Sequence, residues 1–135
     1  MHVLVVDDLT VDRFIIKKLV SPLFKVTTLS SANEAISFAS CNSFQIALLN
    51  VMLKEDMDGL ALLIKLREIS FTPFLAIAIS AHVDELRYQK LIYSGFKEVL
   101  RKPFNLTEFT RVVNPNEYEG KDVIYHSLEQ VELPL

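Results

Sequence analysis

The strongest constraint on the fold is an alternation of short apolar runs with longer segments of helical periodicity. Five runs are predicted as strands, at residues 3–6, 24–28, 45–49, 74–79 and 99–100. Short runs of apolar and β-branched residues are typical of strands that are buried on both faces. Because helical segments separate these strands, the chain predicts an α/β fold with a doubly wound parallel sheet and helices on both of its faces.

The intervening segments carry apolar residues three and four positions apart, the spacing of an amphipathic helix. In the first of them Thr10 is the predicted cap, Asp12 lies in the first turn, and the predicted apolar face is Val11, Phe14, Ile15 and Leu19. Ser31 and Glu34 have the spacing of a capping box at the start of the second helix. The third predicted helix has its apolar residues at Leu60, Leu63 and Ile64, with Leu66 as a further candidate, and weaker or shorter helices are expected at 83–94 and 106–113.

Composition excludes several classes of protein. A chain of 135 residues is expected to form one domain. Three glycines are too few for a glycine-rich phosphate loop, and the single Cys41 excludes an internal disulfide or a cysteine metal cluster. The net charge of -3 is not that of a nucleic-acid binder. Without a predicted signal peptide or an apolar span, we expect a cytoplasmic protein that binds neither nucleic acid nor membrane.

Polar side chains follow four of the predicted strands. They are Asp7 and Asp8, then Asn50, Ser80 and Lys102. In an open parallel sheet these strand ends lie at one edge, where ligands bind. Two adjacent carboxylates repel each other unless a cation compensates, and a divalent ion with oxygen ligands is suited to that role.

Four motifs at these positions, taken together and in order, resemble the receiver domain of two-component response regulators of the chemotaxis type. They are VLVVDD, LLNVMLKEDMDG, ISAH and LRKPF, and the resemblance covers residues 2 to about 113. It implies a flavodoxin-like three-layer sandwich whose five strands lie in the order 2-1-3-4-5. We therefore expect a receiver-like domain at 1–113 and a tail at 114–135, with no separate output domain. The apolar residues of the tail are expected to pack back on the domain or onto a partner.

The resemblance also implies roles for the residues at the strand ends. Asp8, supported by Asp7, resembles the main ligand of Mg²⁺, with Asn50 and the Met52 backbone carbonyl beside it. Ser80 resembles the switch hydroxyl and Lys102 the lysine that contacts a phosphoryl group, and the Lys102–Pro103 bond is expected to be cis. Asn50 stands at the phosphoacceptor position, where the family has an aspartate.

That departure directs the functional hypothesis. An acyl phosphate forms on a nucleophilic carboxylate, and the amide of Asn50 is uncharged, so we expect no catalytic activity and weak or absent Mg²⁺ binding. The leading hypothesis is a stand-alone receiver-like module of a phosphorelay that acts by protein–protein contact. The resemblance implies that its partners are a histidine kinase, a phosphotransfer protein or a downstream signalling protein, bound through residues 83–94, 99–100 and 106–113. A homodimer is also open.

Two other functions are compatible with the sequence. The chain is a conventional phospho-accepting regulator if Asn50 replaces a native aspartate, and a flavin-binding flavodoxin-like domain is a third, less favoured class. Individual residues also have purely structural interpretations. Asn50 is compatible with a turn, Ser80 with a helix cap, and Lys102 with an ion pair to Asp7 or Asp8 in an inert site.

Overall fold

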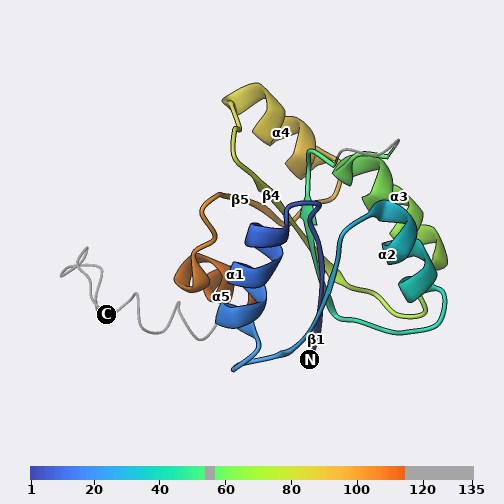
Figure 1. The fold of residues 1–135 in the computed structure, drawn as a ribbon. Coiled ribbons are helices and arrows are strands. Elements are labelled where there is room, and N and C mark those ends of the chain that lie inside the picture. Colours follow the sequence, from blue (N-terminus) through green and yellow to red (C-terminus); the bar gives the residue numbers. More distant parts are fainter. Residues whose placement is uncertain (54–56, 115–135) are drawn as a thin grey trace. The chain divides into compact units, whose positions relative to one another are not determined.

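The computed structural model describes residues 1–53 and 57–114 (Figure 1). Strands and helices alternate along these residues, as the apolar pattern predicts. The strands are β1 (His2–Val6), β2 (Lys25–Leu29), β3 (Ile46–Asn50), β4 (Leu75–Ser80) and β5 (Glu98–Arg101). The helices are α1 (Thr10–Val20), α2 (Ala32–Ala39), α3 (Gly59–Ile69), α4 (Glu85–Tyr93) and α5 (Leu106–Val113).

The five strands form one parallel sheet in the order β2-β1-β3-β4-β5. This confirms the predicted fold class and strand order. Strand β3 lies at the centre, where Ala47 faces Leu4 of β1 and Ala76 of β4 in register. All five residues of β3 are buried, which explains why its sequence is almost wholly apolar.

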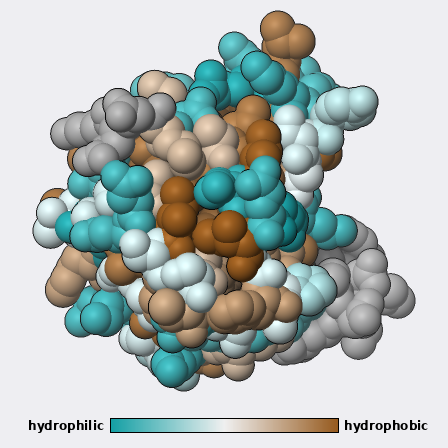
Figure 2. Space-filling view, turned by 90° about the vertical axis from the view of Figure 1, so that its right-hand side faces the viewer, coloured by the Kyte–Doolittle hydropathy of each residue, from teal (hydrophilic) through white to brown (hydrophobic). Residues whose placement is uncertain are grey.

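Helices cover both faces of the sheet. Figure 1 shows α2 and α3 together on one side and α1 on the other. The main apolar cluster lies on the α2–α3 side, with Leu4, Leu49, Leu62, Leu66 and Phe74 among its members. On the face shown in Figure 2, a group of apolar residues lies near the centre with polar residues beside it.

The predicted apolar face of α1 is wrong. The helix buries Ile16 and Val20, whereas Val11 and Phe14 are 67% and 65% exposed. Two apolar stripes run along this helix, so periodicity alone does not say which of them meets the sheet. The same ambiguity affects α3, which buries Leu62, Leu63 and Leu66 and leaves Ile64 exposed.

The predicted cap of α1 also needs correction, whereas that of α2 is confirmed. Helix α1 begins at Thr10 itself, and its N-cap residue is Leu9, which makes no side-chain cap. Ser31 does cap α2, since its hydroxyl accepts the Glu34 N–H at 3.2 Å. The Glu34 carboxylate reaches back as the predicted capping box requires, and its shortest backbone partner is the N–H of Ser30, at 2.8 Å.

The chain divides into two compact units, Met1–Asn105 and Leu106–Leu135, and α5 with Asn114 is the described part of the second. The predicted domain limits of 1–113 and 114–135 stay a prediction. The expected packing of the tail concerns residues outside the described ones. In the part of the chain that the structure describes, no helix is long and apolar enough to cross a membrane.

Candidate functional site

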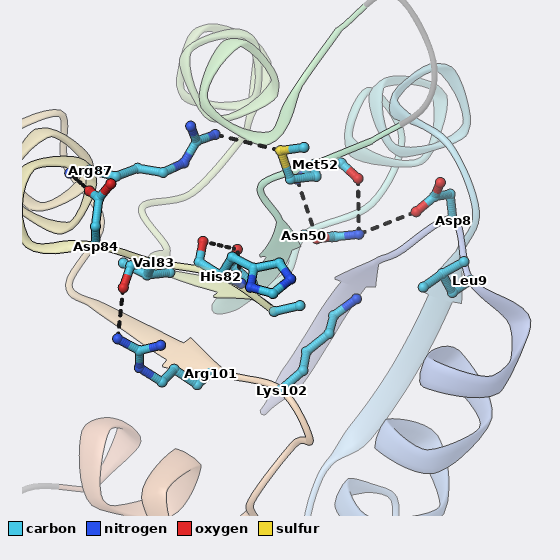
Figure 3. A pocket seen from close by; sticks show the side chains of 12 residues that line it. Asp8, Leu9, Asn50, Met52, His82, Val83, Asp84, Arg87, Arg101 and Lys102 are labelled. Atoms are coloured by element: carbon cyan, nitrogen blue, oxygen red, sulfur yellow. Dashed lines mark hydrogen bonds between the residues drawn. The ribbon is translucent and has the colours of Figure 1, made fainter.

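The strand ends that carry the predicted site residues lie side by side. Val51, directly after β3, donates its N–H to the Ile79 carbonyl at 3.0 Å, and Lys102 donates its N–H to the Ser80 carbonyl at 3.0 Å. These backbone bonds extend the sheet ladder by one residue beyond the strands. They place Asn50, Ser80 and Lys102 on the same edge, next to the acidic pair that follows β1. Figure 3 shows Asp8, Asn50 and Lys102 at this edge.

The side-chain amide of Asn50 lies at the centre of this edge and is 3% exposed. Its nitrogen faces three oxygen acceptors: Asp7 Oδ1 at 3.3 Å, Asp8 Oδ1 at 3.2 Å and the Met52 carbonyl at 3.2 Å. Its oxygen accepts the Met52 N–H at 3.3 Å. The partners distinguish the two ends of the amide, because only its nitrogen can donate to three acceptors.

Asp7 is the fully buried member of the acidic pair, with an exposed fraction of 0%. Burial raises the pKa of its carboxyl group, and the N–H of Leu9 at 3.0 Å together with Lys102 only partly opposes this effect. The Lys102 ammonium lies 3.1 Å from Asp7 Oδ2. Asp7 therefore depends on its neighbours to remain ionised inside the protein.

Lys102 has a second partner that the sequence did not indicate. Its Nζ atom lies 2.7 Å from Asp12 Oδ2, on the first turn of α1. Burial lowers the pKa of Lys102, but its bonds to Asp12 and Asp7 outweigh burial and raise it overall. The available signal was the place of Asp12 in the first turn of the helix that follows the acidic pair.

Ser80 ends β4 and is 1% exposed. Its hydroxyl donates to the His82 carbonyl at 3.0 Å and accepts the His82 N–H at 3.3 Å. Ser80 does not cap α4; that role belongs to Asp84, whose carboxylate accepts the Arg87 N–H at 2.8 Å. The next strand leaves the site through the Lys102–Pro103 bond, which is cis, as the resemblance implies.

A cavity of about 740 Å³ opens at this edge of the sheet. It is lined by Asp8, Leu9, Asn50, Met52, Ser80, Ala81, His82, Val83, Asp84, Arg87, Arg101 and Lys102 (Figure 3). Arg87 reaches across from α4 to the Met52 sulfur at 3.8 Å, and Arg101 donates to the Val83 carbonyl at 2.7 Å. Sequence reasoning missed both arginines, because their place at the rim depends on how α4 approaches β5.

Gly59 fixes the backbone beneath Asn50. A Cβ atom at this position would lie 2.5 Å from the Asn50 carbonyl oxygen and 2.8 Å from the Val51 Cα. The Gly59 N–H donates to the Val51 carbonyl at 3.0 Å. Only glycine permits this approach of α3 to the end of β3.

The predicted ligands of a divalent cation are Asp8, Asn50 and the Met52 backbone carbonyl. Asp8 and the Met52 carbonyl supply oxygen atoms of the kind that Mg²⁺ prefers. Those oxygens are turned toward the Asn50 nitrogen, and the Asn50 oxygen is turned away toward the Met52 N–H. In this orientation the three expected ligands do not fit a cation. The described residues also contain no group of three or more His, Cys, Asp or Glu side chains suited to a metal.

The comparisons with known proteins agree with this geometry. The family model described as the response regulator receiver domain matches residues 3–114. The chain belongs to the response regulator receiver family. Receivers are components of two-component signalling, which confirms the coarse function expected from the motifs.

Named relatives support the assignment. The chain is 30% identical over 119 residues to the two-component response regulator ORR12 of rice, a match that covers 84% of this chain and 95% of that protein. It is 30% identical over 142 residues to ARR7 of Arabidopsis thaliana, covering 94% of this chain and 69% of that one. The receiver domain of a putative LuxO repressor from Vibrio parahaemolyticus has a TM-score of 0.74 at 25% identity, covering 91% of this receiver and 95% of that chain.

Proposed function

We propose that this receiver is a stand-alone module of a two-component phosphorelay that acts through protein–protein contacts and accepts no phosphoryl group at Asn50. One observation carries the proposal. The side chain at the end of the central strand is a buried amide, and its nitrogen points at both neighbouring carboxylates. The rice relative is covered over 95% of its length by the match, so that regulator is little longer than a receiver.

The chemistry follows from the charge of the groups at the site. A phosphoacceptor attacks phosphorus with a carboxylate oxygen, and an amide oxygen carries no comparable negative charge. The two groups that we assign to phosphoryl contact, Ser80 and Lys102, have protein partners that a phosphoryl group would have to displace. The Ser80 hydroxyl binds the His82 carbonyl, and the Lys102 ammonium is held by Asp7 and Asp12. We therefore propose that the site has no self-phosphorylating activity.

We propose that Mg²⁺ binds weakly at this site, through Asp8, the Met52 carbonyl and an Asn50 side chain that has turned over. Two features support this. The amide has one formal negative charge fewer than the aspartate of the family, and a cation has to compete with the amide nitrogen for the same oxygens.

The output surface is proposed to include α4 and β5. Leu86 and Tyr93 on α4 are 82% and 94% exposed. Large apolar and aromatic side chains of a helix that packs on a sheet are usually buried to a much greater extent. Leu86 and Tyr93 lie two turns apart on one face of the helix. We propose that a kinase, phosphotransfer protein or downstream signalling protein binds this face. A cytoplasmic location is proposed from the family alone.

The test is intact-mass measurement after incubation with Mg²⁺ and a small acyl phosphate. The wild-type chain should gain no adduct, whereas a phosphoryl group would add about 80 Da. The Asn50→Asp variant is the matched control, because it changes one side-chain group and restores the carboxylate. It should take up one phosphoryl group, which shows that the donor and the rest of the site are competent.

Two results would contradict the proposal. A stoichiometric adduct on the wild-type chain, mapped to the cavity residues, would make the protein a conventional phospho-accepting regulator. Failure of Asn50→Asp to label would show that the loss of activity lies elsewhere in the site and not in the amide.

A further inference from the structure

We infer that the Asn50 amide takes the place of a bound cation, so that the acidic edge of the sheet is held together without metal. The inference rests on the proposed function, because it concerns the same side chain, but it makes a separate claim about the resting state.

The geometry places a donor where positive charge is needed. Asp7, Asp8 and the Met52 carbonyl present three oxygen atoms to one point, and the Asn50 nitrogen lies 3.2–3.3 Å from each. Two hydrogens on that nitrogen serve three acceptors, so at least one hydrogen is shared. The oxygens therefore face the positive end of a dipole rather than one another.

The alternatives for these acceptors are limited by burial. Asp7 is 0% exposed, so water cannot replace the amide nitrogen at its Oδ1 atom without opening the site. Lys102 neutralises the other oxygen, Oδ2, at 3.1 Å. The ammonium, the amide and the Leu9 N–H at 3.0 Å thus share the Asp7 carboxylate, and of these three groups it is the amide that also bonds to Asp8.

The amide also fixes the segment that follows β3. Met52 both donates to the Asn50 oxygen and accepts from the Asn50 nitrogen, so both of its backbone groups are bound by one side chain. A carboxylate at position 50 could accept the Met52 N–H but could donate to none of the three oxygens. Without metal it would add a third negative charge beside Asp7 and Asp8, and these charges would repel.

The experiment compares the full-length wild type with Asn50→Asp and with the apolar variant Asn50→Leu. Thermal midpoints are measured in EDTA and in a series of MgCl₂ concentrations, with NaCl added to equal ionic strength. The wild type should have the highest midpoint in EDTA and should not respond to millimolar Mg²⁺. Asn50→Asp should have a lower midpoint in EDTA and should recover with Mg²⁺, at a concentration about tenfold or more below any that affects the wild type.

A direct readout does not depend on the variants folding well. In a ¹⁵N-labelled wild-type protein, the two side-chain N–H signals of Asn50 should exchange slowly with solvent and should not move on addition of Mg²⁺. The inference is overturned if Mg²⁺ shifts those signals or raises the wild-type midpoint as much as that of Asn50→Asp. It is also overturned if Asn50→Asp or Asn50→Leu matches the wild-type midpoint in EDTA.

These outcomes are separate from those of the phosphorylation test. A wild-type chain that responds strongly to Mg²⁺ but takes no phosphoryl group would refute the inference and leave the proposed function intact. A wild-type chain that becomes phosphorylated would refute the proposed function, whatever the midpoints are.

Discussion

Replacing Lys102 with methionine should destabilise the fold because it removes the counter-ion of a fully buried carboxylate. Methionine keeps the length and apolar stem of lysine and removes only the ammonium. Lys102 Nζ lies 3.1 Å from Asp7 Oδ2, and the Asp7 side chain has no exposed surface. Removing one partner of a buried pair costs about 3–5 kcal/mol, because the remaining charge is uncompensated.

Two features limit how much of the free energy of unfolding is lost. Asp7 keeps the Leu9 N–H at 3.0 Å and the Asn50 nitrogen at 3.3 Å, which still stabilise its charged form. The protein can also escape by protonating Asp7. The ordinary pKa of this carboxyl group, 3.8, lies about 3.2 units below pH 7. Each unit corresponds to about 1.36 kcal/mol, so protonating Asp7 at pH 7 costs at most about 4.4 kcal/mol. We expect Lys102→Met to lower the free energy of unfolding by about 2–4 kcal/mol at pH 7.

The stability lost in Lys102→Met should depend on pH. Burial raises the pKa of Asp7, so the folded protein binds a proton more readily at this site than the unfolded chain does. The penalty for burying the charge is therefore absent below the unfolded pKa and grows as the pH rises above it. At pH 5 the limit set by protonation falls to about 1.6 kcal/mol, so the loss in Lys102→Met should be clearly smaller than at pH 7.

Urea unfolding at pH 5 and pH 7 measures these losses, with Asp12→Asn as the matched control. That variant removes the charge from the shorter contact of Lys102, at 2.7 Å, but Asp12 is 24% exposed and Asp7 keeps its counter-ion. We expect it to lose only about 0.2–1 kcal/mol. If Lys102→Met is as mild as Asp12→Asn, or loses as much at pH 5 as at pH 7, Asp7 does not depend on the ammonium.

Two further predictions concern other parts of the molecule. Gly59→Ala should lower the free energy of unfolding by about 2–3 kcal/mol, because its Cβ would overlap the Asn50 backbone; the exposed control Ala61→Gly should lose at most about 1 kcal/mol in the same urea series. Equal losses in the two variants would contradict the close approach. Burial lowers the pKa of His2, assisted by Lys25 and the chain terminus, so the neutral ring is favoured in the folded state and stability should decline as the pH falls below about 6.5. Thermal midpoints between pH 5 and 8 should show this decline in the wild type and a weaker one in His2→Gln; parallel curves would exclude His2 as the cause.

The order of strands and helices could be predicted from the sequence because the central strands are buried on both faces. Val3, Leu48 and Ile77 each have no exposed surface, and such positions accept few residues other than apolar ones. The polar residues after these strands could be predicted as neighbours for a related reason. Parallel strands end at the same edge of a sheet, so residues far apart in the chain meet there.

The faces of the helices could not be predicted in the same way. Helix α1 has apolar residues on two sides, and only contact with the sheet decides that Ile16 is buried and Phe14 is exposed. One of the two partners of Lys102 was likewise missed: the ion pair with Asp7 was among the alternatives, whereas the one with Asp12 was not. The sequence places three carboxylates, those of Asp7, Asp8 and Asp12, shortly after β1. Which of them meet the Lys102 ammonium depends on the direction in which α1 leaves β1, and the structure pairs it with Asp7 and Asp12.

The sequence by itself determined the fold class, the chemistry available at the edge of the sheet and the absence of a carboxylate at position 50, since these follow from residue types and their order. The tertiary structure alone decided which atoms meet. A one-dimensional pattern can place an amide among acids, but the orientation of that amide depends on distances set by packing. Here three oxygens surround the Asn50 nitrogen, and the Met52 N–H holds its oxygen on the other side.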